Sequence, residues 1–318
     1  MYLTQYSIRI THNELMKPNL EVKIGKLKLK NPVMVASGTF GYGTEFEDVA
    51  DIEELGAIAT KTITLRARVG NKPPRIIETP SGMLNSIGLE NPGADRFIED
   101  KLPSLRKFKI PIIVSIAGET VDEYEKLTKR LDKVKEIAAI EINISCPNIH
   151  TDQLFAQDAT LTKEIVKAVR SATQKTIITK LSPNVTDIVS IAKSAESAGS
   201  DALSLINTIS AMVVDIEKRQ SRLGDITGGL SGPAVKPIAL FMVWRVYNNV
   251  KIPIIGMGGI MSWQDAIEFI LCGSTAVAVG TANFVNPNAA AEIARGIKKY
   301  LREKKIKDIN KLVGNLKT

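Results

Sequence analysis

Short apolar segments rich in β-branched residues recur along the chain, and a polar or glycine-bearing loop follows each of them. They are too short for stable helices and are predicted to be buried β-strands. Between them the sequence shows helical periodicity with a charged face, as in residues 121–134, 161–172 and 188–198. The predicted strands are residues 32–36, 57–62, 112–116, 139–144, 176–181, 202–207, 252–256 and 276–280.

This alternation of strands and helices predicts an α/β fold with a parallel sheet, because each helix returns the chain to the same end of the sheet. Eight such units are the number that closes a (β/α)8 TIM barrel, in which catalytic groups lie at the carboxyl ends of the strands. An open, doubly wound sheet is the alternative. Since no low-complexity linker or second repeat interrupts the pattern, we expect one barrel domain over residues 1–318.

Three segments fall outside the strand–helix pattern. Residues 20–29 alternate apolar and charged side chains around Gly25, which predicts a β-hairpin capping one end of the barrel. Two connections, residues 65–95 and 209–232, are longer than a barrel requires, and both leave the carboxyl end of a strand. Long loops in compact domains are usually functional or disordered, so we expect these two to form lids or walls of a substrate site.

Composition narrows the class of protein. With 318 residues, 44% of them hydrophobic, the chain can bury a full core. It has only two cysteines, Cys146 and Cys272, which excludes a cysteine-ligated iron–sulfur cluster or structural zinc site within the chain. No segment approaches eighteen unbroken apolar residues, and the N-terminus lacks the pattern of a signal peptide. We therefore expect a cytoplasmic protein with no membrane association.

Charge and histidine content argue against two further classes. The net charge of +8 comes mostly from lysines concentrated at residues 298–311, a run typical of one solvated helix face. Aromatic residues make up only 5% of the chain, so no nucleic-acid partner is expected, although the charge could attract anionic substrates. His12 and His150 lack ligand spacing, and no carboxylate pair ends a strand, so no metal site is expected.

A thiol follows the predicted strand at residues 139–144. Asn143 lies at the end of this strand, and Cys146 comes next on a segment that Pro147 prevents from continuing the sheet. An accessible thiolate can transfer a proton or act as a nucleophile. The alternative is a small buried cysteine that only packs, which is the commoner role of free cysteine.

Two glycine-rich turns follow the last two strands, at residues 256–260 and 279–284. Exposed amides there form the phosphate site common in barrels, although close packing explains any single glycine equally well. Lys61 and Lys180 end strands in apolar surroundings, and an inward lysine needs an anionic partner, whereas a snorkelling lysine needs only water. Together these features fit flavin mononucleotide (FMN), because a nearby lysine can stabilise the charge of its reduced ring.

Nine motifs in one order make the chain similar to the dihydroorotate dehydrogenase family, over roughly residues 20–284. They are SGTFGYG (37–43), ATKTITLRARVGNKPPRI (59–76), GMLNSIGLENPG (82–93), INISCPN (142–148), KLSPNVTDI (180–188), INT (206–208), GGLSGPAVKP (228–237), IIGMGGI (254–260) and AVGTANF (278–284). The resemblance implies FMN at the barrel mouth and oxidation of (S)-dihydroorotate to orotate in pyrimidine biosynthesis, with hydride passing to flavin N5.

The resemblance also implies a catalytic residue and a partner. Cys146 occupies the position of the general base in the soluble class 1 enzymes, whereas the membrane-associated class 2 has serine there and an N-terminal extension. The motifs at 82–93 and 180–188 look most like class 1B, whose catalytic subunit works with a second subunit that carries FAD and a [2Fe–2S] cluster. A homodimer or a heterotetramer is therefore expected.

The motifs carry the family's binding residues onto this chain. The substrate residues implied are Lys61, Asn85, Ser86, Ile87, Gly88, Leu89, Asn143, Asn148, Asn207 and Thr208. The cofactor residues implied are Ala36, Ser37, Gly38, Lys61, Thr62, Ser115, Asn143, Lys180, Ile206, Gly232, Gly258, Gly259, Gly280 and Thr281, with Lys180 at the reducible edge of the flavin.

Two other functions remain open from the sequence. One is a dihydropyrimidine dehydrogenase-like flavin domain that acts on uracil or thymine; Lys61 argues against it, because the carboxylate of dihydroorotate requires a cation and uracil does not. The other is a barrel without enzymatic activity that binds a phosphorylated ligand.

Overall fold

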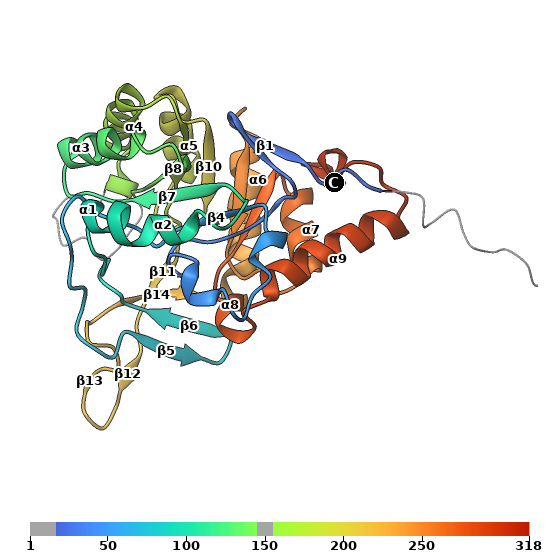
Figure 1. Cartoon of the computed structure of the whole chain (residues 1–318). Helices are drawn as coiled ribbons and strands as arrows, with labels where there is room; N and C mark the ends of the chain where they lie inside the picture. The colour runs from blue at the N-terminus through green and yellow to red at the C-terminus, as the bar shows by residue number, and fades with distance from the viewer. Residues whose placement is uncertain (1–16, 145–154, 318) are drawn as a thin grey trace, which may run out of the picture.

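A computed structural model describes residues 17–144 and 155–317, and eight parallel strands close into a barrel (Figure 1). Their order around the barrel equals their order along the chain, so the predicted (β/α)8 barrel is confirmed and the open doubly wound sheet is wrong. The strands are β3 (Val33–Val35), β4 (Ala57–Ala59), β7 (Ile112–Ile116), β8 (Ile137–Asn143), β9 (Thr176–Lys180), β10 (Ala202–Leu205), β15 (Ile254–Met257) and β16 (Ala276–Val279).

Helices cover the outside of the barrel, with α3, α4 and α5 on one side and α7 and α9 on the opposite side (Figure 1). The α-helices are α1 (Ala94–Arg96), α2 (Leu102–Leu105), α3 (Val121–Asp132), α4 (Ala159–Ala172), α5 (Ile188–Ser197), α6 (Lys236–Tyr247), α7 (Trp263–Leu271), α8 (Ala282–Val285) and α9 (Ala289–Glu303). Short turns of other helix types are η1 (Thr44–Phe46), η2 (Ile52–Glu54), η3 (Phe97–Lys101), η4 (Phe155–Gln157), η5 (Pro233–Val235) and η6 (Ile309–Leu312).

Side-chain caps mark the beginnings of α3 and α5. Thr120 accepts a hydrogen bond from the Glu123 amide at the start of α3, and Asp187 accepts one from the Val189 amide at the start of α5. Each cap satisfies an amide that has no partner within its helix, which typically stabilises the helix by about 1 kcal/mol.

The barrel strands are buried on both faces. All five residues of β7 and all five of β9 are buried, as expected for parallel strands enclosed between a barrel interior and a layer of helices. The helices contribute apolar stripes to this core, as Tyr124, Leu127 and Leu131 do from α3. The core thus holds the carboxyl ends of the strands in fixed positions.

The two long connections pair with each other outside the barrel. Strands β5 (Ile76–Thr79) and β6 (Gly82–Asn85) come from the first connection, and β11 (Ile209–Ala211) and β14 (Gly228–Ser231) from the second. They form one sheet in the order β11-β14-β6-β5, and the hairpin of β12 (Val214–Asp215) and β13 (Gln220–Ser221) projects beyond it (Figure 1). The sequence predicted lids or walls here but not strands.

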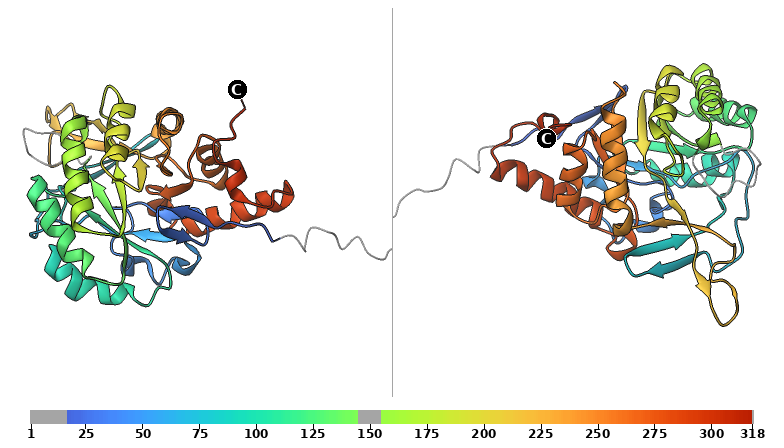
Figure 2. Two further views of the ribbon diagram at one scale, coloured as in Figure 1. Left: turned by 90° about the horizontal axis from the view of Figure 1, so that it is seen from above. Right: turned by 180° about the vertical axis from the view of Figure 1, so that it is seen from behind.

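The predicted N-terminal hairpin is confirmed as β1 (Val22–Ile24) and β2 (Leu27–Leu29). Gly25 turns the chain at a φ of 57°, and the Lys26 amide donates to Thr176 Oγ1 over 3.1 Å. Because Thr176 is the first residue of β9, the hairpin caps the amino end of the barrel. It lies beside the C-terminal segment (Figure 2), where the Ile309 amide donates to the Asn19 carbonyl over 3.0 Å.

The basic run near the C-terminus is not one helix face. Helix α9 ends at Glu303, and Lys305, at a φ of 56°, reverses the chain so that the Ile306 amide bonds back to the Leu301 carbonyl. The prediction of a single helix is therefore wrong in its second half, although Lys298, like Lys305, is exposed. Within the described residues, no helix combines the length and the apolar character needed to cross a bilayer.

Candidate active site

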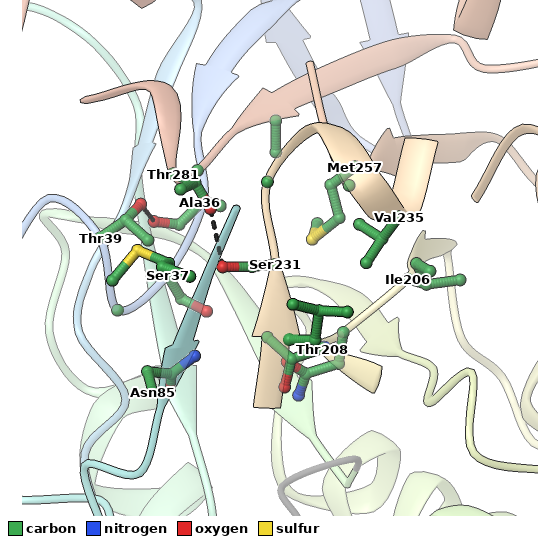
Figure 3. A pocket seen from close by; sticks show the side chains of 18 of the residues that line it. Ala36, Ser37, Thr39, Asn85, Ile206, Thr208, Ser231, Val235, Met257 and Thr281 are labelled. Atoms are coloured by element: carbon green, nitrogen blue, oxygen red, sulfur yellow. Dashed lines mark hydrogen bonds between the residues drawn. The ribbon is translucent and has the colours of Figure 1, made fainter. Parts of the chain in front are cut away.

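A cleft opens at the carboxyl ends of the barrel strands, between them and the outer sheet of β5, β6, β11 and β14 (Figure 3). It has about 1300 Å³ of empty space, including the part open to solvent. The structure brings most of the predicted binding residues to its walls: Ala36, Ser37, Gly38, Lys61, Thr62, Asn85, Ile87, Leu89, Asn143, Lys180, Ile206, Asn207, Thr208, Gly232, Gly258, Gly259, Gly280 and Thr281.

Five predicted residues are not placed in the cleft wall. Ser115 lies behind it, fully buried, with its hydroxyl 3.0 Å from that of Thr62. Ser86 is fully buried, and its hydroxyl accepts a hydrogen bond from Asn71 Nδ2 over 2.9 Å, whereas Gly88 lines a second cavity. Cys146 and Asn148 lie outside the described residues. The binding roles of these five residues, like those of the residues in the cleft wall, stay predictions.

Sequence analysis missed two parts of the wall: the hydroxyl residues Thr39 and Ser231, and an apolar part that consists of Ile76, Met83, Leu230, Val235, Met257, Ile260, Met261, Ala278 and Phe284. Several of these residues belong to the motifs quoted above. An apolar residue type alone, however, does not tell whether a side chain lines a cleft or packs in the core. Ser231 could be found only from the fold, because its hydroxyl accepts from Thr281 Oγ1 over 2.8 Å across two distant segments (Figure 3).

Neutral amides gather toward one end of the cleft. Asn143 Nδ2 donates to Thr62 Oγ1 over 3.3 Å, and Asn207 Nδ2 faces Asn143 Oδ1 at 3.5 Å. Asn85, on β6, donates to the Gly229 carbonyl over 3.1 Å. Figure 3 shows Asn85 and Thr208 toward this end and Thr281 toward the other. Side-chain amides both donate and accept, so this end suits a planar ligand with amide edges.

Two lysines face the cleft. Lys180 is only 5% exposed, and its ammonium donates to Ser37 Oγ over 3.1 Å, so the snorkelling alternative is wrong for this residue. Lys61 Nζ lies 3.9 Å from Glu90 Oε2, and Arg75 Nη1 donates to the same oxygen over 2.6 Å. Glu90, which sequence analysis did not single out, therefore interacts with both Lys61 and Arg75.

The glycine turns present unused amides at the opposite end. Gly258 and Gly259 have φ values of 121° and 78°, and a Cβ on Gly259 would lie 2.8 Å from the Gly232 carbonyl oxygen. No hydrogen bond inside the described part of the chain uses the amides of Gly258, Gly259, Gly280 or Thr281. Amides that line a cleft without internal partners are ready donors to phosphate oxygens.

An ion pair anchors the segment that follows the first glycine turn. Lys236 Nζ donates to Asp265 Oδ1 over 2.6 Å, and Asp265 Oδ2 accepts from the amides of Met261 and Ser262. Burial acts to raise the pKa of Asp265, but the hydrogen bond from Lys236 and those from residues 261 and 262 keep it below its ordinary value. The hydrogen bond to Asp265 raises the pKa of Lys236 in turn.

A buried phenol lies near the Lys61 end without lining the cleft. Burial, together with the negative charges of Glu45 and Glu90, raises the pKa of Tyr42. Its hydroxyl has no hydrogen-bond partner among the described residues. Tyr42 therefore stays protonated and neutral across the physiological range, and it does not supply a base to the cleft.

The fold and the cleft define a class: a (β/α)8 barrel with a cleft at the carboxyl ends of its strands, lined by backbone amides at one end and by asparagines and Lys61 at the other. A family model described as dihydroorotate dehydrogenase matches residues 19–301. The chain belongs to the dihydroorotate dehydrogenase family, so the family resemblance predicted from the motifs is confirmed, and with it the assignment as an oxidoreductase.

Three curated relatives carry the name dihydroorotate dehydrogenase B (NAD(+)), catalytic subunit. The protein of Trichlorobacter lovleyi is 57% identical over 302 residues, which cover 95% of this chain and 99% of the relative. That of Desulforudis audaxviator is 56% identical over 300 residues (94% and 98%), and that of Geobacter sulfurreducens is 54% identical over 303 residues (95% and 99%). These names agree with the predicted likeness to class 1B.

Proposed function

We propose that the chain is the FMN-binding catalytic subunit of a dehydrogenase that oxidises (S)-dihydroorotate to orotate in pyrimidine biosynthesis. The observation that carries the proposal is the meeting, in one cleft, of unused backbone amides, the buried Lys180 and a cluster of neutral amides beside Lys61. Uracil or thymine as substrate, and a barrel without activity, explain less, because neither calls for a cation beside the amides.

The residues present fit FMN. The amides of Gly258, Gly259, Gly280 and Thr281 would hold its phosphate, since they have no internal partners in the described chain. Lys180 would face the reducible edge of the ring, where its positive charge favours the reduced form. FMN, when bound, supplies the acceptor for the substrate hydride.

The substrate would lie at the amide end. Asn85, Asn143 and Asn207 offer donors and acceptors to the two amide edges of the pyrimidine ring, and Lys61 offers a cation to its carboxylate. Charge-assisted hydrogen bonds are roughly twice as strong as neutral ones, so Lys61 would provide most of the discrimination between dihydroorotate and uracil.

Cys146 is proposed as the general base that removes the proton from C5 of the substrate. It follows Asn143 by three residues in the sequence, and Asn143 lies both at the end of β8 and in the cleft wall. A thiol with an ordinary pKa of about 8.5 is mostly protonated at neutral pH, so activity should rise as the pH approaches that value.

Replacing Cys146 with alanine tests this role. We expect the turnover rate to fall by about 10²- to 10⁴-fold, the usual contribution of a general base, while FMN stays bound. Stopped-flow measurement of flavin reduction by dihydroorotate isolates the chemical step, and C272A, the other cysteine, serves as the matched control. A C146A enzyme that reduces its flavin at the normal rate would show that the thiol only packs.

We further propose a partner subunit that carries FAD and a [2Fe–2S] cluster and passes electrons to NAD⁺. Two cysteines are too few for the chain to hold such a cluster itself, so electron transfer through one requires another protein. Co-purification from native cells, followed by the visible spectrum of the complex, tests the proposal, because flavin and iron–sulfur absorption differ. Isolation of a complex with flavin absorption alone would contradict it.

The substrate assignment has its own experiment. Orotate should perturb the absorption spectrum of the bound flavin at concentrations well below those at which uracil has an effect, because only orotate engages Lys61 through a charge. A protein that stays colourless after incubation with FMN would rule out the flavoenzyme, and equal responses to the two ligands would remove the preference for a carboxylate.

A further inference from the structure

Asn184 lies just beyond the cleft wall, four residues after Lys180, in the loop that leaves β9. Backbone hydrogen bonds join β9 and β10 and continue past the ends of both strands. The Leu181 amide donates to the Ser204 carbonyl, and the Asn207 amide donates to the Leu181 carbonyl over 3.1 Å. This backbone ladder stops at Asn207. The next residue, Thr208, lines the cleft.

Beyond the end of this backbone ladder, the Asn184 side chain forms the next hydrogen bonds between the two segments. Its Nδ2 donates to the Thr208 carbonyl over 3.1 Å and to Ser182 Oγ over 3.2 Å, and its Oδ1 accepts from the Ser210 amide over 2.9 Å. Both ends of the amide are therefore used, and two of the three bonds hold the backbone on either side of Ile209, where β11 begins. Only a residue that donates and accepts at once can make this set.

The Asn184 backbone reaches a third segment. Its carbonyl accepts a hydrogen bond from Gln157 Nε2 over 2.8 Å, and Gln157 belongs to η4, which precedes α4. One residue thus connects the segment after β9, the first residues after β10 and the turn before α4, three segments that are distant in sequence and meet at one side of the cleft.

We propose that Asn184 is a positioning residue that holds Thr208 and Asn207 in the geometry required for pyrimidine binding; the inference rests on the proposed function. The link runs through the backbone. The Thr208 amide donates to Asn207 Oδ1 over 2.8 Å, so the orientation of the Asn207 side-chain amide depends on where Thr208 lies. Asn207 Nδ2 in turn faces Asn143 Oδ1 at 3.5 Å.

Packing on the opposite side of Thr208 makes its position depend on the hydrogen bond from Asn184. A Cβ on Gly229 of β14 would lie only 1.9 Å from Thr208 Oγ1, so the two segments are already in close contact and Thr208 cannot shift toward the outer sheet. Without the hydrogen bond from Asn184, the segment can move only toward the cleft or away from β9. Either movement displaces the groups that would meet the ligand.

Replacing Asn184 with alanine in the FMN-loaded full-length protein tests the inference. We expect the Kd for orotate, measured by flavin absorbance, and the KM for dihydroorotate to rise about tenfold, in keeping with the loss of one to two neutral hydrogen bonds, while the FMN content stays stoichiometric. Asn248→Ala is the matched control, since Asn248 is exposed at the end of α6 and donates only to the Trp244 carbonyl. Orotate binding by N184A within twofold of that of N248A would overturn the inference.

Asn184→Asp supplies a readout that a purely structural role would not change. Its carboxylate can still accept from the Ser210 amide but cannot donate to the Thr208 carbonyl, whereas the protonated acid can do both. The ratio of the N184D Kd for orotate to that of the wild type should therefore fall as the pH is lowered from 8 toward 4.5. A ratio that stays constant over this range would count against the inference, even if N184A proved unstable.

The proposed function and the role of Asn184 are contradicted by different results. If wild-type holoprotein gives no flavin response to orotate, the proposed function fails and the role of Asn184 fails with it. If the wild type responds and N184A responds equally, only the role of Asn184 is lost.

Discussion

The two ends of the cleft are built from different parts of the chain. The proposed phosphate end consists of backbone amides at Gly258, Gly259, Gly280 and Thr281, whereas the proposed pyrimidine end consists of side chains, Lys61 and the asparagines, on or just after separate strands. At Gly258 and Gly259 the first depends on positive φ values that glycine adopts without strain, and the second depends on functional groups. We therefore expect side-chain changes at the proposed pyrimidine end to leave the cofactor bound, and changes in the glycine turn at the proposed phosphate end to weaken its binding.

The largest effect is expected from Gly259→Ala. A Cβ there would lie 2.8 Å from the Gly232 carbonyl oxygen and 2.8 Å from Lys236 Cβ, at a φ of 78° that alanine adopts only with strain. The turn must shift, so we expect FMN affinity to fall by about 100-fold or more, corresponding to roughly 3 kcal/mol. Titration of the apoprotein with FMN, followed by quenching of flavin fluorescence, measures it.

Gly199→Ala is the control for strain alone. Gly199 lies between α5 and β10, away from the cleft, and has a φ of 102°. A Cβ there would lie 3.0 Å from Cγ of Arg170, a side chain that pairs with Asp201. Both variants should lower the melting temperature, but only G259A should lose FMN. Equal FMN affinities in the two variants would mean that the phosphate is bound elsewhere.

The barrel could be predicted from the sequence, whereas the outer sheet could not. The buried strands are marked by short β-branched runs, and Ile112–Ile116 was predicted to the residue. Strands β5 and β6 pair with each other as a local hairpin, and the outer sheet is completed where Asn85 of β6 pairs with Gly229 of β14, from a connection far along the chain. Pairing of this kind depends on tertiary contacts that local pattern does not encode.

The site follows the same division. Residues at the ends of marked strands, such as Asn143 and Lys180, could be placed in the cleft from the barrel geometry and the motifs. Glu90 could not, because it lies in the loop between β6 and α1, where a single charged residue carries no periodic signal, and its partners Lys61 and Arg75 come from other segments. Sequence thus predicts which residues end strands better than it predicts their neighbours.

A smaller, ligand-specific effect is expected at the pyrimidine end from Lys61→Gln. Glutamine keeps much of the length and the hydrogen bonding but removes the charge, so the Kd for orotate should rise about 10- to 100-fold, as for a lost charge-assisted hydrogen bond. FMN should remain bound through the glycine amides. Titration with orotate, followed by the flavin spectrum, gives the constant.

Uracil is the internal control for this variant. It has no carboxylate, so its Kd should change by less than about threefold in K61Q. Equal losses of affinity for orotate and uracil would show that Lys61 acts through the shape of the site, and loss of FMN would contradict the independence of the two ends.

The smallest effect is expected from Asp265→Asn, which weakens the anchor behind the phosphate end. The pKa of Asp265 is lowered in the folded protein, so its stabilisation is complete above the ordinary value of 3.8 and is lost as the pH falls through the folded pKa. At pH 7 the variant should lose about 1–2 kcal/mol in the free energy of unfolding, since one partner of a partly buried ion pair is removed. FMN affinity should fall by only a few-fold, because the glycine backbone itself is unchanged.

Urea unfolding of D265N at pH 7 and pH 3 measures this contribution. The difference from the wild type should shrink at pH 3, because below the ordinary pKa of 3.8 the carboxylate of the unfolded state takes up a proton, whereas the folded state holds the pKa of Asp265 lower. Asp122→Asn is the matched control, since Asp122 pairs with Lys126 on the exposed face of α3 and should cost less than about 0.5 kcal/mol. A difference that is the same at both pH values would mean that Asp265 stabilises the turn through its hydrogen bonds and not through its charge.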